Sequence, residues 1–417
     1  MFLPVRQHFP HRKLDDIPAA VDGELASSGL GSRLSPGARI AIGVGSRGIS
    51  NLAEIVHTVV DFFNSRGFRP FLFPAMGSHG AANAAGQASV LAHYGIEEST
   101  MGCPVVSRFD VISLGKTDAG IEVFAGKDAW SSDAIFVINR VKWHTSFAGA
   151  LESGVSKMMA LGLGKIEGAK CCHGHARTLG MEAVIRSVAG HLLASGKILG
   201  GLAILEDAYH DTAQVTALAA DGLIEREVEL LCLVKSWMGK LPVPALDVLI
   251  VDQIGKNISG TGMDLKVVNR GVHGQYNPWP DTPRVERIFI RSLSELSYGN
   301  GVGTGLADVI HDRVLTRIDV NAGRINATTS GSLAAVRTPL HFPSDRECLD
   351  LLSATVGKFD AADVTMGWIR NTLDLGVVAL SENLAGEIGK NPMLEISGPP
   401  FAPAFDGNGN LGLFPCD

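Results

Sequence analysis

Cysteine is scarce in this chain: 417 residues contain six, with no CxxC pair and no regular spacing. This pattern excludes a disulfide-stapled secreted domain and suits a reducing cytoplasm. The N-terminus lacks the apolar core of a signal peptide, and no stretch approaches about 18 uninterrupted apolar residues, so neither secretion nor a membrane-spanning helix is expected. Basic charge is not in excess either. The formal charge of −7 argues against a nucleic-acid or anionic-membrane surface.

What the chain does have is length, apolar residues and glycine-rich turns. With 46% hydrophobic and 19% charged residues over 417 positions, it has material for two α/β domains. Strand-like and helix-like segments alternate up to about residue 240, which predicts a doubly wound, mostly parallel sheet. Prolines at 242 and 244 precede a new apolar strand. We therefore expect an N-terminal domain over 1–240 and a mixed α/β domain over 241–417.

The second half mixes strands at 284–293 and 375–380 with helices at 305–318 and 346–357. Before these segments, residues 255–281 are rich in Gly, Asn and Pro. A loop of this length inside a compact domain is often functional.

A glycine-rich turn follows the strand predicted at 39–44. Gly43-x-Gly45-x-x-Gly48 has the outline of a dinucleotide-binding fingerprint, with a helix after it. That fingerprint also needs an acidic residue at the end of the second strand, and no Asp or Glu occurs between 62 and 96. The simplest alternative is that the glycines only let the strand turn tightly into the helix, which Asn51 and Glu54 are expected to cap.

Ser46 and Arg47 occupy the middle of this turn. They follow the carboxyl end of a strand, where open α/β sheets bind ligands. An arginine there is suited to bidentate binding of a carboxylate.

Four histidines of the first half follow apolar strands or lie in glycine-rich turns: His79, His144, His173 and His175. Any one of them could be an ordinary surface histidine, but strand ends of one sheet converge on one crevice. Lys157 starts a short helix between two glycine-rich turns. The positive end of the helix dipole would lower its pKa and make the amine more nucleophilic, although a solvated lysine remains the alternative.

These segments together resemble the lactate racemase family, whose members use a nickel-pincer nucleotide. The resemblance covers most of the first domain and part of the second. It implies that Arg47 binds the substrate carboxylate and that His79 and His144 act as acid and base on either side of the substrate. It further implies that Lys157 holds the cofactor covalently, and that His173, sixteen residues further on, ligates nickel.

The resemblance extends to Gln253 and Lys256, whose Gln-x-x-Lys spacing matches a substrate-contacting motif, and it adds Ser46 to the substrate site. It implies a racemase or epimerase of a 2-hydroxy acid that works by reversible hydride transfer through a 2-keto acid. The N-terminal domain would bind the cofactor, the second would close over the substrate, and the active site would lie in the cleft between them. Other proteins would make and deliver the cofactor. The sequence does not determine the oligomeric state, and it is compatible with a homo-oligomer.

Three departures from the family surround the substrate and not the metal. An acid is missing before Ser46, no arginine follows His79, and the segment between His144 and Lys157 is longer. They leave the identity of the hydroxy acid open. Two other functions also remain: a zinc or other divalent-metal hydrolase built on His173 and His175, and a binding protein or NAD-dependent dehydrogenase using the glycine turn.

Three further residues, two cysteines and a tryptophan, have expected roles in packing. Cys171 and Cys172 are expected to pack as small apolar side chains. Trp368 either belongs to a core or lines the cleft.

Overall fold

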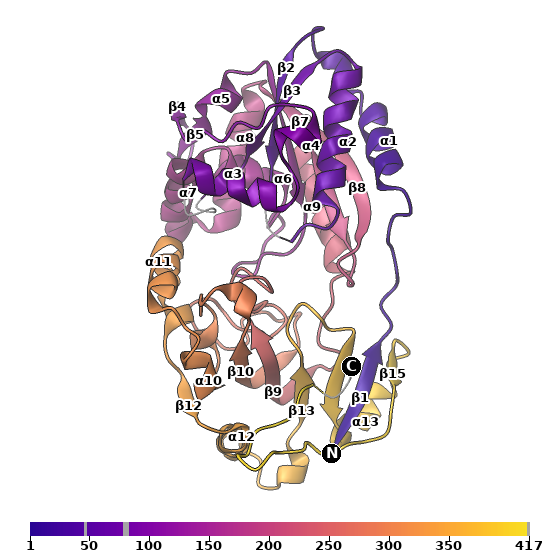
Figure 1. Cartoon of the computed structure of the whole chain (residues 1–417), viewed down its shortest axis with the longest axis vertical. Coiled ribbons are helices and arrows are strands. Elements are labelled where there is room, and N and C mark those ends of the chain that lie inside the picture. The colour runs from indigo at the N-terminus through magenta and orange to yellow at the C-terminus, as the bar shows by residue number, and fades with distance from the viewer. Residues whose placement is uncertain (46–47, 78–82, 415–417) are drawn as a thin grey trace. The chain divides into compact units, whose positions relative to one another are not determined.

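The computed structural model describes residues 1–45, 48–77 and 83–414, and its chain forms two compact units (Figure 1). One unit is His11–Met238. The other combines Met1–Pro10 with Gly239–Asp417. The junction lies two residues from the predicted boundary, but the first ten residues were assigned to the wrong side. They belong with the C-terminal unit because Phe2–Gln7 forms strand β1, which pairs antiparallel with two strands of that unit.

The His11–Met238 unit is built on a five-stranded sheet in the order β3-β2-β6-β7-β8. The first four strands are parallel, and β8 runs antiparallel to β7. This agrees with the doubly wound, mostly parallel sheet expected from the alternating segments. The strands are β2 (Arg39–Val44), β3 (Arg69–Pro74), β6 (Ala134–Arg140), β7 (Ile198–Glu206) and β8 (Thr212–Ala219). A separate hairpin pairs β4 (Val111–Lys116) with β5 (Glu122–Gly126).

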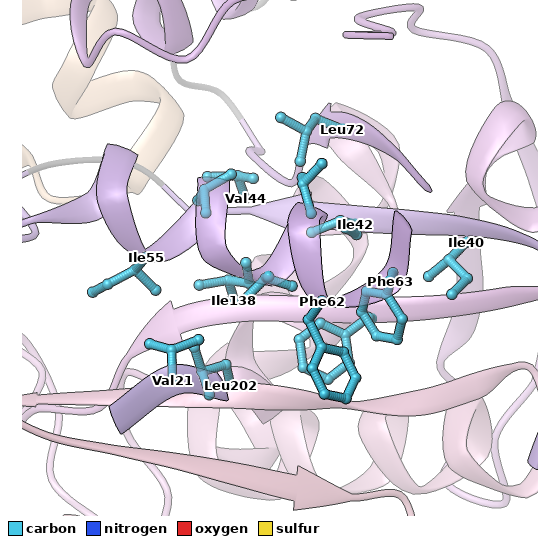
Figure 2. Packing of buried hydrophobic residues seen from close by; sticks show 14 of the residues in the cluster. Val21, Ile40, Ile42, Val44, Ile55, Phe62, Phe63, Leu72, Ile138 and Leu202 are labelled. Carbon is cyan, nitrogen blue, oxygen red and sulfur yellow. The ribbon is translucent and has the colours of Figure 1, made fainter. Parts of the chain in front are cut away.

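Helices cover both faces of this sheet because its strands are apolar on both sides. Along β2, Ile40 and Ile42 face one core while Ala41 faces the other. Figure 2 shows the first core, where α2 packs Ile55 and Phe63 against these strand residues. The helices of the unit are α1 (Ile17–Ser27), α2 (Leu52–Ser65), α3 (Ala84–His93), α4 (Glu98–Met101), α5 (Lys127–Trp130), α6 (Val155–Lys157), α7 (Lys165–Leu179), α8 (Met181–Ala194) and α9 (Leu223–Lys235).

The start of α2 differs from the prediction. The Asn51 side chain caps no helical N–H; its backbone is left-handed at φ 55°, and its Oδ1 lies 3.1 Å from the hydroxyl of Thr212. A tertiary partner has replaced the local cap.

The second unit contains an eight-stranded sheet in the order β12-β11-β10-β9-β13-β14-β1-β15. Its first five strands are parallel and the last three antiparallel, so the sheet is mixed as predicted. The strands besides β1 are β9 (Ala245–Ile254), β10 (Arg284–Leu293), β11 (Val309–His311), β12 (Leu340–Phe342), β13 (Met366–Ile369), β14 (Val377–Ser381) and β15 (Leu394–Ile396). The helices are α10 (Asp312–Leu315), α11 (Val320–Ser330), α12 (Asp345–Ala354) and α13 (Ala385–Ile388).

The helix predicted over 305–318 is wrong in part. Val309–His311 forms β11, parallel to β10, and the α-helical part is Asp312–Leu315, with a 3-10 turn at Thr304–Leu306 before the strand. A short apolar run cannot be assigned from its spacing alone, and here pairing with β10 decided it. Residues 255–281 contain neither helix nor strand, as predicted. Within the part of the chain that is described, no helix combines the length and the apolar composition that crossing a bilayer requires.

Candidate functional site

Strands β2 and β6 define the topological switch point of the His11–Met238 sheet. The chain leaves β2 for β3 on one side and later returns to β6 on the other. Ligands of open α/β sheets bind outside the carboxyl ends of such strands. Ser46 and Arg47 come directly after β2, and His79 comes after β3. All three lie outside the described residues, so their assignments stay predictions.

The glycine-rich turn predicted over 43–48 is held at its described residues, which lie on either side of positions 46 and 47. Before them, Gly45 donates its N–H to Ile138 of β6 at 3.1 Å. After them, Arg140 donates to the Gly48 carbonyl at 2.6 Å and pairs with the buried carboxylate of Glu206. Glu206 also accepts the N–H of Ser50 at 2.9 Å. A largely desolvated charge pair therefore holds the segment that leads from this turn into α2.

Lys157 is the last residue of α6, and the chain continues from it as the π-helical segment η3 (Met158–Gly162). Such π-helical turns are rare in proteins, and those that occur are often found at functional sites. The start of α6 is fixed from outside: Glu227 of α9 accepts the Ser156 N–H at 2.8 Å and its hydroxyl, and Asn139 of β6 donates to the Gly154 carbonyl at 2.8 Å. Burial raises the pKa of Glu227, and the hydrogen bonds from Ser156 oppose that rise.

The segment that carries Lys157 lies against the ends of both β2 and β3. A β-carbon on Gly45 would lie 3.0 Å from Met158 Cε, and one on Gly162 would lie 2.6 Å from the Ala75 carbonyl oxygen. A β-carbon on Gly77 would lie 3.0 Å from that of Ala169 in α7. Glycine at these positions lets three segments meet: the turn after β2, the start of the turn after β3, and η3 with α7.

The charge of Lys157 acts on His173 of α7. His173 is an exposed residue, but the protein around its ring still lowers the pKa of the imidazole by desolvation, and the charge of Lys157 lowers it further. Both effects favour the neutral imidazole, which is the form that ligates a metal. An electrostatic interaction therefore links two residues that the resemblance pairs at a spacing of sixteen, and their roles stay predictions.

His144 lies in the loop between β6 and α6, which closes around the buried Glu152. This carboxylate accepts the backbone N–H of His144 at 2.5 Å and that of Gly149 at 3.2 Å. The amine of Lys235 in α9 lies 2.5 Å from Oε1 of the same carboxylate. His144 is half-buried, and its ring stacks on Phe147 with centroids 4.4 Å apart.

The buried carboxylates Glu152 and Glu227 were not anticipated from the sequence. For Glu227 a signal existed: it falls on the apolar face of α9 between Leu223, Ile224, Leu230 and Leu231, all buried. An acid at such a position needs a buried partner. Glu152, in an irregular loop, carried no comparable signal.

His173 and His175 do not form a joint metal site. They are two residues apart in α7, so their side chains leave the helix about 200° apart. Cys172 packs in the core, where burial raises the pKa of its thiol to about 12, and Cys171 packs against the same core. Across residues 1–45, 48–77 and 83–414, no three His, Cys, Asp or Glu side chains come together as a metal site. The hydrolase reading of this cluster is therefore not favoured, and the expected apolar packing of both cysteines is confirmed.

The dehydrogenase reading also lacks its acidic residue. Strand β3 and the described residues after it, up to Gly77, contain no Asp or Glu that could hold a ribose.

Gln253 and Lys256 belong to the other unit, at the carboxyl end of β9. Both are half-buried. The side-chain amine of Lys256 donates to the Gly260 carbonyl at 2.5 Å, and the backbone N–H of Lys256 donates to the Ser297 hydroxyl at 3.1 Å. These hydrogen bonds shape the start of the loop over 255–281. Trp368, in the same unit, is a core residue: it is 2% exposed and donates its indole N–H to Asp252 at 2.6 Å.

Comparison of the sequence with protein-family models and with curated proteins finds no match. Comparison with solved structures finds the lactate racemase apoprotein from Thermoanaerobacterium thermosaccharolyticum. The two chains are 11% identical, with a TM-score of 0.52, and the match covers 89% of this chain and 99% of the other. At this identity the likeness shows the fold, over nearly the whole of both chains. The resemblance seen in the motifs is thus confirmed in the architecture: this chain is folded like a lactate racemase apoprotein.

Proposed function

We propose that this protein is a racemase or epimerase of a 2-hydroxy acid that works through a 2-keto acid. The observation that carries the proposal is the pairing of Lys157 with His173 beside the switch point of a sheet, in a chain that has the fold of a lactate racemase apoprotein. Fold likeness alone would not assign an activity. The pairing supplies the chemistry, because it matches an amine that tethers a cofactor to an imidazole that ligates its metal.

The described residues fit a nickel-pincer nucleotide. A metal that arrives with donors of its own needs only one protein ligand, and His173 offers a neutral imidazole for it. Lys157 would hold the group covalently. When bound, the cofactor would supply the hydride acceptor that no side chain provides. Cofactor-making proteins would then be partners of this chain.

The remaining roles follow from charge and hydrogen-bonding capacity. Arg47, helped by Ser46, would bind the substrate carboxylate. His79 and His144 would exchange hydrogen bonds and protons with the substrate oxygen, and Gln253 and Lys256 would contact the substrate from the second unit.

Intact mass under denaturing conditions tests the proposal. The protein is co-expressed with the pincer-making enzymes, alongside Lys157→Ala and the matched control Lys170→Ala, which alters an exposed lysine of α7. We expect a mass increment in the parent and in Lys170→Ala and none in Lys157→Ala. Absence of the increment from all three would overturn the proposal, as would an increment that persists in Lys157→Ala. Loaded protein would then be assayed for racemisation of chiral 2-hydroxy acids.

A further inference from the structure

The imidazole of His144 faces a backbone donor. Its Nδ1 accepts the N–H of Ser146 at 3.1 Å and lies 3.0 Å from the Ser146 hydroxyl. A backbone N–H can only donate, so Nδ1 must present its lone pair. A neutral imidazole has one proton, and in this geometry that proton is on Nε2.

A histidine that serves as a base through Nε2 has the opposite arrangement. Its Nδ1 carries the proton and donates to a carboxylate or carbonyl, which leaves the Nε2 lone pair for the substrate. The nearest carboxylate in sequence, Glu152, does not play this part, because it binds the backbone N–H groups of His144 and Gly149 and the amine of Lys235. Moving the proton of His144 to Nδ1 would set two N–H groups against each other.

The same local arrangement occurs at His311 in the other unit. There Nδ1 accepts the Arg313 N–H at 3.0 Å, and Nε2 lies 2.8 Å from Asn410 Oδ1. Asn410 Oδ1 also accepts from Arg313 at 2.7 Å, so it is an acceptor and Nε2 of His311 is the donor. This chain therefore already contains one histidine that donates from Nε2 because a following N–H occupies Nδ1.

We propose that His144 acts as a neutral hydrogen-bond donor through Nε2, and that Ser146 is the positioning residue whose N–H selects this tautomer. This inference rests on the proposed function and narrows it: of the two histidines, His144 exchanges only a hydrogen bond with the substrate oxygen, and not a proton. The N–H of His144 stabilises the substrate oxygen as it becomes the carbonyl of the 2-keto acid, in the way that a neutral histidine polarises a carbonyl in other isomerases. The hydroxyl proton goes to a different group, for which His79 is the candidate.

Nitrogen NMR on the full chain with ¹⁵N-labelled histidine tests the tautomer directly. At pH 7.5 we expect the His144 signals, assigned by their loss in His144→Gln, to show an unprotonated Nδ1 and a protonated Nε2. His311 should show the same pattern and serves as the internal reference. A protonated Nδ1 at His144 would overturn the inference.

Two variants of Ser146 test the cause. Ser146→Ala keeps the backbone N–H and should keep the pattern, whereas Ser146→Pro removes the N–H and should lose it. Loss of the pattern in Ser146→Ala would mean that the hydroxyl, and not the N–H, selects the tautomer. If Ser146→Pro does not fold, the parent spectrum still decides between the two tautomers.

Kinetics of loaded enzyme separate donor from base. Glutamine can donate from its side-chain amide but cannot take a proton. As a donor site, His144→Gln should retain kcat within about tenfold and His144→Phe should lose about 100-fold or more. Equal losses of about 100- to 10,000-fold in both would indicate a base. The NMR result does not depend on activity, so the two proposals can fail separately. A missing mass increment with this tautomer present would contradict only the proposed function. A mass increment with the proton of His144 on Nδ1 would contradict only this inference.

Discussion

Lys165 has two features that each lower the stability of the folded protein. Its backbone is left-handed at φ 51°, which non-glycine residues rarely adopt, and its side chain is only 2% exposed. The amine lies 2.5 Å from the Pro74 carbonyl at the end of β3 and 3.4 Å from Gln87 Oε1. Gln87 in turn donates to the Met76 carbonyl at 2.9 Å. These bonds fix the chain where it leaves β3.

The buried amine predicts a stability change at alkaline pH. Burial lowers the pKa of Lys165 from 10.5 to about 8, and the charge of Asp128 opposes this shift. Between these two values the unfolded chain holds a proton that the folded chain has lost, so the free energy of unfolding rises with pH. The span of 10.5 − 8 = 2.5 units corresponds to roughly 3 kcal/mol. Lys165→Met lacks this gain, so its stability relative to the parent should fall as the pH rises above about 8.

Urea unfolding of parent and variant between pH 7 and pH 10 would measure that difference. Lys170→Met, on the exposed side of the same helix, is the matched control, and its difference from the parent should stay constant with pH. A constant difference for Lys165→Met as well would show that the amine is not desolvated in the folded protein.

At the scale of elements, the position of η3 depends on the absence of a side chain at Gly162. A β-carbon there would lie 2.4 Å from Met158 Sδ and 2.6 Å from the Ala75 carbonyl oxygen. The sulfur can move, but the carbonyl belongs to the backbone leaving β3. Gly162→Ala should therefore push η3 away from the strand end and destabilise the protein by about 1–3 kcal/mol, the usual cost of overpacking.

Gly190→Ala is the control for this substitution. Gly190 lies inside α8, and a β-carbon there would meet nothing within 4 Å. Alanine should stabilise that helix by about 0.5–1 kcal/mol. Chemical denaturation of both variants checks the pair. Equal effects of the two substitutions would contradict the close packing of η3 on β3.

Elements with a long, uniform pattern were predictable from sequence. The strands at 39–44 and 284–293 were predicted to the residue because their apolar runs end in polar or glycine-rich turns. β11 was not, since its three residues, Val309–His311, are too few to show the period of a helix or of a strand. β1 was missed because its partners β14 and β15 lie more than 370 residues away in the chain. Long-range pairing leaves no trace in a local pattern.

The candidate site divides in the same way. Lys157 and His173 were paired by the resemblance to the lactate racemase family, through their spacing of sixteen residues, and their roles stay predictions. The tautomer of His144 and the buried carboxylates Glu152 and Glu227 depend on hydrogen bonds to groups that only the folded chain brings near. The type of residue limits the chemical roles of its side chain, and the hydrogen-bond partners in the folded chain determine which of these roles it takes.

At the scale of the whole molecule, the two units differ in how they use the chain. Both cores of His11–Met238 are made from that one continuous segment. The other unit needs both ends: Phe2 packs in its core, edge-on to Trp368 at 6.1 Å and stacked on Phe401 at 5.9 Å. β15 pairs with β1, and β1 with β14, so without β1 the last strand is detached and the edge of β14 is exposed.

Separated fragments should reflect this difference. Expressed alone, residues 11–238 should unfold cooperatively, because their cores are complete. Residues 239–417 alone should aggregate or lack a cooperative transition, since an exposed edge strand and an incomplete core favour association. A permuted chain, 239–417 followed by a flexible linker and residues 1–10, restores β1 and should recover a cooperative thermal transition and a monomeric elution volume. If 239–417 unfolded at the same temperature with and without the appended strand, β1 would contribute nothing to that unit, and the assignment of the first ten residues to it would have no energetic meaning.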